Sequence, residues 1–241
     1  QHERRKYLKD GALWKFAGLG RYGRARLERA RRLAGFGFGP SVAGLQNGFL
    51  ITEFLAGRPL SENDVSERLL DAMARYLALL EREFPSAKPV PYDELRQIIA
   101  INAPGVPVPA DGAVRDGHTV AVDSRMLPHE WLETSGGLIK TDGIDHHDDH
   151  FFSGCQDIAW DVAGACVEFS LSDAAAEYLL ARYESLTKDG HIRRRLPFYR
   201  TAYLSYRYGY ASLAAQSLGD TAEGRRFEWL SAHYRTELYG R

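Results

Sequence analysis

The sequence predicts an α+β protein in which a small, strand-rich N-terminal lobe precedes a larger helical lobe. Short strand-like runs separated by turn residues fill residues 1–57. Apolar residues then recur at helical spacing through most of residues 58–241. We therefore expect an N-lobe over the first of these ranges and a helical C-lobe over the second.

The N-terminal lobe is predicted to contain two hairpins and one helix. The runs KYL and ALWKF flank the turn KDG, which indicates the first hairpin. After GLGRYG, a helix is expected over about 24–34, and GFGFGP ends it because glycine and proline cap and break helices. SVAGL and FLITEFL, joined by the hairpin signal QNG, predict the second hairpin.

The C-terminal lobe is predicted to be helical around a short stretch of strands. HTVAVDSRM begins as a strand, and EWLET, SGG and LIKTD then predict a hairpin within 118–145. Apolar periodicity predicts helices over 64–84, 92–103, 157–169, 173–186, 197–218 and 222–238.

Bulk properties narrow the possible classes of protein. The net charge is −1, which argues against general binding of nucleic acid or a membrane surface. Two basic clusters, at 21–32 and 193–195, are expected to be solvated helix faces. No run of residues is long and apolar enough for a membrane span, and two cysteines fit reduced thiols in a cytoplasmic protein. The chain begins with Gln in an apparent strand, so we expect it to belong to a longer protein.

The stretch GLGRYG has the G-x-G-x-x-G spacing of phosphate-binding loops. A dinucleotide-binding fold requires a parallel βαβ unit around it, whereas an antiparallel hairpin follows here. A protein-kinase glycine loop must precede the strand that carries the lysine, whereas Lys15 comes first here. We therefore expect GLGRYG to be a turn between a strand and a helix.

Lys15 itself suggests a nucleotide site. It lies in an apolar strand, from which a cation can reach the α- and β-phosphates of a nucleotide. Glu28 follows on the next helix, where it is expected to pair with Lys15 and hold it in place.

Two further motifs resemble the aminoglycoside phosphotransferase and choline kinase-like families. FLITEFLAGRPL resembles their hinge, in which an acidic residue is followed by a glycine and a leucine, matched by Glu53, Gly57 and Leu60. QDIAWDVAGA is similar to their G-D-P-x-x-D-L-A segment, with Asp157 and Asp161 in the acidic places. The resemblance implies a two-lobed, protein-kinase-like fold, and the nucleotide would contact Glu53 at the hinge.

The resemblance also implies a catalytic loop, a hairpin and a metal-binding aspartate. In the family pattern H-G-D-x-x-x-x-N, Asp123 takes the place of the base and His129 falls near the Asn. Asp142 follows the hairpin and would hold Mg²⁺ against the phosphates of ATP, with His129 as a further ligand. Asp157 and Asp161 would act structurally, and Asp161 would cap its helix and brace the loop.

A second register remains open, in which Asp142 is the base, His147 replaces the Asn and Asp157 binds the metal. The first register places a hairpin between the base and the metal ligand. In that register Ala121 and Val122 replace the family's His-Gly, and the glycine-rich nucleotide loop would have to precede Gln1.

The cluster DHHDDH, at 145–150, allows two interpretations. With His129, it loosely imitates the H…HD…D pattern of metal-dependent phosphohydrolases, in which a metal-bound hydroxide attacks a phosphate ester. In the kinase-like interpretation, His146, His147 and Asp149 lie at the mouth of the cleft and contact the acceptor or a metal.

The function predicted is transfer of a phosphoryl group from ATP to the hydroxyl or amine of a small molecule, with Mg²⁺. The alternatives are a non-catalytic kinase-like binding or regulatory module and a metal-dependent phosphohydrolase. The missing glycine loop and the altered His-Gly and Asn positions favour the first alternative.

Overall fold

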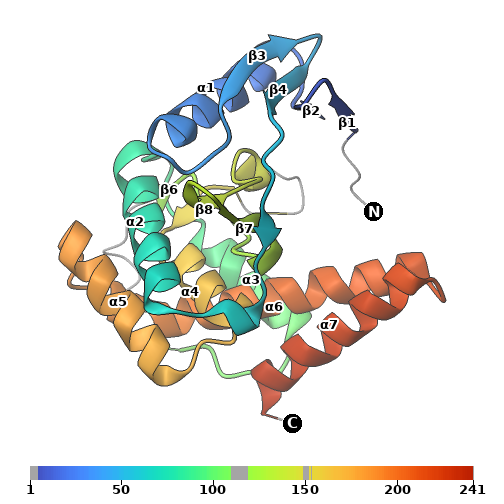
Figure 1. Cartoon of the computed structure of the whole chain (residues 1–241). Coiled ribbons are helices and arrows are strands. Elements are labelled where there is room, and N and C mark those ends of the chain that lie inside the picture. The colour runs from blue at the N-terminus through green and yellow to red at the C-terminus, as the bar shows by residue number, and fades with distance from the viewer. Residues whose placement is uncertain (1–4, 110–118, 149–151, 153, 241) are drawn as a thin grey trace.

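The computed structural model describes residues 5–109, 119–148, 152 and 154–240. Figure 1 shows two parts, a small sheet with one helix and a larger helical part in which α6 and α7 project together to one side. This is the predicted α+β arrangement, with strands concentrated near the N-terminus and helices dominating the rest.

The small lobe is a four-stranded antiparallel sheet with the order β1-β2-β4-β3. Its elements are β1 (Lys6–Lys9), β2 (Ala12–Phe16), α1 (Gly20–Gly35), β3 (Val42–Gln46) and β4 (Phe49–Glu53). Both predicted hairpins are confirmed. Each turns through two residues of positive φ, Asp10 and Gly11 in the first and Asn47 and Gly48 in the second.

The motif GLGRYG forms the turn into α1, as predicted, but the helix begins within the motif at Gly20 rather than at residue 24. Gly18 has a φ of 102°, which favours glycine. A Cβ on Gly23 would lie 2.2 Å from the carbonyl oxygen of Gly18, so the first helical turn packs directly on the turn before it.

Two smaller sheets follow along the chain, and the first of them, β5-β7-β8, contains the predicted hairpin. β5 (Arg58–Pro59) pairs with β7 (Trp131–Thr134), and β7 pairs with β8 (Gly137–Lys140) in the hairpin expected from the sequence. The strand expected over HTVAVDSRM is only β6 (Thr119–Val120), which pairs with β9 (Gln156–Asp157). The chain leaves the extended conformation at Ser124, which has a φ of 76°.

The described residues of the larger lobe form six main helices: α2 (Glu67–Glu83), α3 (Tyr92–Asn102), α4 (Ala159–Glu168), α5 (Asp173–Thr187), α6 (Ile192–Leu218) and α7 (Ala222–Tyr239). Ser66, Ser172 and Thr221 cap α2, α5 and α7 by accepting a backbone N–H in the first turn. The core forms around α2 and α4, where Tyr76 and Trp160 are fully buried.

The basic clusters differ from expectation. Arg24 and Arg31 are exposed, as predicted, but Arg29 and Arg195 are only 5% and 2% exposed. Both are buried because acceptors surround them: Arg29 bonds to backbone carbonyls, and Arg195 pairs with Asp157.

Cys155 and Cys166 are free thiols, as expected. No helix in the described part of the chain is long and apolar enough to cross a lipid bilayer.

Candidate active site

Two cavities lie between the lobes. The first, which we call the apolar cavity, has a volume of about 330 Å³ and lies between the small-lobe sheet and the β7–β8 hairpin. The chain leaving β4, residues 53–55, closes one side of it. Its lining includes Leu13, Leu33, Phe38, Leu50 and Leu132. Its size and composition fit a site for a small organic group.

The second cavity, which we call the charged cavity, has a volume of about 720 Å³. The loop before the hairpin, the segment 142–148 and helices α6 and α7 surround it. Its ionic lining residues are Lys6, Lys15, Arg26, Arg125, Arg207, Arg226, Glu130, Asp142, Asp145, Asp148 and Glu168.

The two cavities share one wall, to which Lys15 and Asp142 both belong, together with Lys6, His129 and Glu130. A molecule in either cavity therefore faces the same charged groups. Glu53, predicted to contact the nucleotide, lines the apolar cavity at the end of β4, where it accepts a hydrogen bond from Ser41.

Lys15 and Asp142, which are 127 positions apart in the sequence, form an ion pair across the lobes. The Lys15 ammonium also lies 3.3 Å from Oδ1 of Asp145, and Lys6 lies 3.6 Å from Asp142. Burial opposes ionisation of Asp142, but Lys15, His146 and Lys6 hold the pKa of this carboxyl well below its usual range. The group is therefore a permanent anion at neutral pH.

The expected pair between Lys15 and Glu28 does not form. Glu28 is exposed on α1, whereas the buried face of that helix carries Gly23, Arg29, Ala30 and Leu33. Helical spacing turns position 28 away from this face. Asp142 and Asp145 take its place as the carboxylate partners of Lys15.

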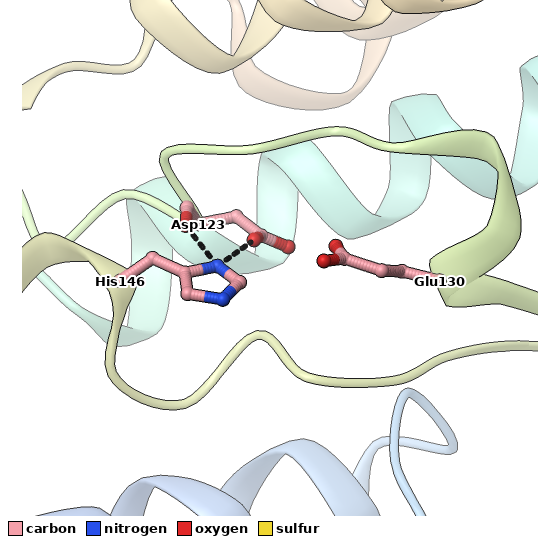
Figure 2. A group of neighbouring side chains, drawn as sticks. All are labelled: Asp123, Glu130 and His146. Atoms are coloured by element: carbon pink, nitrogen blue, oxygen red, sulfur yellow. Dashed lines mark hydrogen bonds and ion pairs between the residues drawn. The ribbon is translucent and has the colours of Figure 1, made fainter. Parts of the chain in front are cut away.

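Asp123 lies in a different environment from the one expected of a base. Its carboxylate is fully buried, accepts from the Tyr76 hydroxyl at 2.8 Å and lies 2.8 Å from the Lys140 ammonium. His146 also lies against this carboxylate, with Nδ1 3.4 Å from Oδ1 (Figure 2). Burial disfavours the charged form, but Lys140 and His146 lower the pKa of Asp123 well below its usual range. Asp123 is among the lining residues of neither cavity.

Asp161 contacts the loop as the resemblance implied. Its carboxylate accepts the backbone N–H groups of Asp123 and Ser124, at 2.7 and 2.8 Å. Burial and the neighbouring Asp123 raise the pKa of Asp161 to about 7. The N-cap of α4 is Ile158, which makes no side-chain cap, whereas Asp157 accepts the N–H of Ala159, the first residue of that helix, at 2.8 Å.

The partners of Asp157 are not residues of the shared wall. Its carboxylate is buried and lies 2.9 Å from the Arg195 guanidinium, in an ion pair that also includes Asp189. The alternative register, with Asp157 as a metal ligand beside Asp142 and His147, is therefore not supported by the positions of these groups.

Glu130 and Lys140 are among the charged residues of the site that were not predicted. Glu130 directly precedes β7, and Lys140 ends β8 opposite Trp131. The family pattern places its Asn five residues after the base. Counted back from Glu130 at the start of the hairpin, the base position falls on Arg125, a lining residue of the charged cavity. The start of the hairpin was the signal that could have given this register.

The histidines of the candidate site have different positions. His129 is exposed and lines both cavities. His146 is buried against Asp123, whereas burial and Arg29 lower the pKa of His147 to about 4. Asp149 lies outside the described residues. In the described part of the chain, the groups of side chains that could hold a metal are Asp142, Asp145, His146 and Asp123, Glu130, His146.

The comparisons with known proteins agree in one respect only, the fold. No protein-family model and no curated protein matches the sequence. Among solved structures, a choline/ethanolamine kinase family protein from Mesorhizobium loti is 17% identical with a TM-score of 0.63, and the match covers 98% of this chain and 85% of that one. Choline kinase LicA from Streptococcus pneumoniae is 15% identical with a TM-score of 0.61, covering 98% and 91%.

A glucosamine kinase in complex with glucosamine, ADP and inorganic phosphate is 15% identical, with a TM-score of 0.64 and coverage of 98% and 79%. The resemblance noted in the sequence therefore extends over almost the whole chain in three dimensions. The chain has the two-lobed, protein-kinase-like fold of these small-molecule kinases.

Proposed function

We propose that the protein is an ATP-dependent phosphotransferase that acts on a hydroxyl or amine of a small molecule. The observation that carries this proposal is the wall shared by the two cavities, with Lys15 and Asp142 paired on it. A transferase needs two substrates whose reacting atoms meet at one place, and this wall is such a place.

The apolar cavity would take the base of the nucleotide. Leu13 and Leu50 line it from the small-lobe sheet and Leu132 from the β7–β8 hairpin, so a flat ring would be buried between the lobes. The phosphates would then extend toward Lys15, whose ammonium neutralises part of their charge. The neighbouring structure that contains ADP supports a nucleotide in this fold.

Mg²⁺ fits the carboxylates of Asp142 and Asp145, because this ion prefers oxygen ligands and these groups lie together beside Lys15. When bound, it would neutralise charge on the β- and γ-phosphates. His146, the third member of this group, offers nitrogen and is a poorer ligand for Mg²⁺. The role of His129 as a further ligand of Mg²⁺ stays a prediction.

The charged cavity would take the acceptor. Phosphoryl transfer depends mainly on positioning and on neutralising charge, which the shared wall supplies. The base predicted at Asp123 is not supported, since that carboxylate is buried behind Lys140, Tyr76 and His146.

That burial favours a second candidate function, a kinase-like module that binds a nucleotide without transferring phosphate. The position of Arg125 where the family pattern has its base favours it too. A phosphohydrolase is not supported, because His129 and His147 belong to neither metal-capable group of the described residues.

Calorimetric titration of Mg²⁺-ATP tests the proposal. We expect binding by the unmodified chain and a Kd at least about tenfold weaker in Asp142→Asn, which equals about 1.4 kcal/mol. Glu28→Gln is the matched control, because Glu28 is exposed away from both cavities, and it should bind as the unmodified chain does. Failure of the unmodified chain to bind Mg²⁺-ATP would refute the phosphotransferase.

Measurement of ADP release with a panel of hydroxyl and amine acceptors then separates the two candidate functions. Release that depends on an acceptor supports transfer. Nucleotide binding with no release for any acceptor class supports the non-catalytic module.

A further inference from the structure

Lys140 is buried at the centre of the site in an unusual way for a lysine. Its side chain is 0% exposed, although it lies only two positions before Asp142 on the shared wall. Nζ lies 2.8 Å from Oδ2 of Asp123 and donates to Oε2 of Glu130 at 2.8 Å and to the Thr141 carbonyl at 3.0 Å. An ammonium has three N–H groups, so these contacts use all of them.

The surroundings of Lys140 resemble a site for a metal ion. Ligand atoms of Asp123, Glu130 and His146 lie within 4.8 Å of one another, and Figure 2 shows the two carboxylates pointing toward each other. Two buried carboxylates this close need a cation between them, because their mutual repulsion is strong where water is excluded. Lys140 supplies that cation, because its Nζ lies 2.8 Å from a carboxylate oxygen of each of the two residues.

Lys15, which lies beside the carboxylates of Asp142 and Asp145, differs from Lys140 in its access to the cavities. It pairs with Asp142 and Asp145 but also lines both cavities, so its ammonium can turn toward a bound phosphate. Lys140 lines only the apolar cavity of the two, its side chain is 0% exposed, and the pairing of β8 with β7 holds its backbone opposite Trp131. It has no comparable freedom to leave its carboxylates.

We propose that the ammonium of Lys140 occupies the place of a divalent cation between Asp123 and Glu130, so that divalent metal binds at Asp142 and Asp145 alone. Protein kinases hold two Mg²⁺ ions, one of them through the Asn that ends the catalytic loop. Here Glu130 directly precedes the hairpin, and its carboxylate is already neutralised by a side chain of the protein. The inference rests on the proposed function only for assigning the remaining metal to a nucleotide.

Mn²⁺ binding measured by electron paramagnetic resonance, without nucleotide, tests this inference. We expect Lys140→Met to bind about one more Mn²⁺ per chain than the unmodified protein. Without the ammonium, the carboxylates of Asp123 and Glu130 repel each other and bind a cation in its place. The double variant Lys140→Met/Glu130→Gln should lose that extra ion. Lys9→Met, at an exposed position on β1, is the control and should leave the count unchanged.

An unchanged Mn²⁺ count in a folded Lys140→Met protein would overturn the inference. If circular dichroism shows that Lys140→Met does not fold, a second measurement replaces it. The number of bound Mn²⁺ ions is then compared between the unmodified protein and Glu130→Gln, in the presence of a non-hydrolysable ATP analogue. Equal counts support the inference, and loss of one ion in Glu130→Gln overturns it. The nucleotide-free counts do not depend on phosphotransferase activity, so the two proposals can fail separately.

Discussion

At the scale of single residues, burial and hydrogen bonding shift the pKa of Asp161 in opposite directions. It is 0% exposed, it accepts two backbone N–H groups, and a second carboxylate, Asp123, lies beside it. The hydrogen bonds favour the charged form, whereas burial and Asp123 favour the neutral form and raise the pKa to about 7. The unfolded chain would titrate Asp161 near the ordinary value for aspartate.

This difference predicts how stability depends on pH. Between about pH 4 and pH 7 the folded protein holds a proton on Asp161 that the unfolded chain has released, so the contribution of Asp161 falls as pH rises through this range. Urea denaturation of the unmodified protein and Asp161→Asn measures it. The difference in free energy of unfolding should shrink toward pH 7, by at most about 4 kcal/mol. Parallel pH profiles would contradict the prediction.

At the scale of secondary-structure elements, Arg29 is the buried side chain that connects α1 to the large lobe, beside the ion pair of Arg32 with Glu83. Arg29 donates to the carbonyls of Gly143 and Ala121, both at 2.8 Å, and to that of Val122 at 3.4 Å. Its guanidinium also lies 4.4 Å from the centre of the Phe84 ring. The helix is thereby tied to the two residues before Asp123 and to the residue after Asp142.

Replacing Arg29 should therefore weaken this connection and expose its acceptors. Arg29→Met leaves buried carbonyls without a donor, and we expect the free energy of unfolding to fall by about 3 kcal/mol. Hydrogen exchange of residues 119–124 and 141–145 should become faster, since the helix no longer holds them. Arg31→Met, at an exposed position of the same helix, is the control and should change neither quantity. Equal effects from both variants would contradict the role of Arg29.

At the scale of the whole molecule, the lobes meet around the two cavities. Lys15 comes from β2 of the small lobe, whereas Asp142 follows β8 of the large lobe. Because the sheet and the hairpin both line the apolar cavity, a nucleotide there would contact both lobes at once.

Binding should consequently protect both lobes together. We expect hydrogen exchange to slow in β2, in the chain after β4 and in the β7–β8 hairpin when Mg²⁺-ATP is added, because all three line the apolar cavity. Protection confined to one lobe would show that the nucleotide binds elsewhere. Asp142→Asn, at the same ATP concentration, should show weaker protection of all three.

Much of the fold followed from local patterns in the sequence. The Asp-Gly and Asn-Gly turns predicted both small-lobe hairpins, and apolar periodicity predicted the large helices, because turn chemistry and amphipathic spacing act over a few residues. The pairing of Lys15 with Glu28 failed, because one helical position decides which way a side chain faces. The register of the catalytic loop was also ambiguous, since both Asp123 and Asp142 could take the place of the base, and Arg125, which the start of the hairpin indicates, lies in an irregular segment two positions after Asp123.

The order of the motifs, through their resemblance to the aminoglycoside phosphotransferase and choline kinase-like families, was sufficient to predict a two-lobed, kinase-like chain with Lys15 and Asp142 in its cleft, because each motif is a short contiguous stretch. The tertiary structure alone decided which charges meet: Asp145 with Lys15, and Lys140 between Asp123 and Glu130. These contacts join residues from different elements, and charge pairing in a site that excludes water depends on distances of a few ångströms that sequence spacing does not encode.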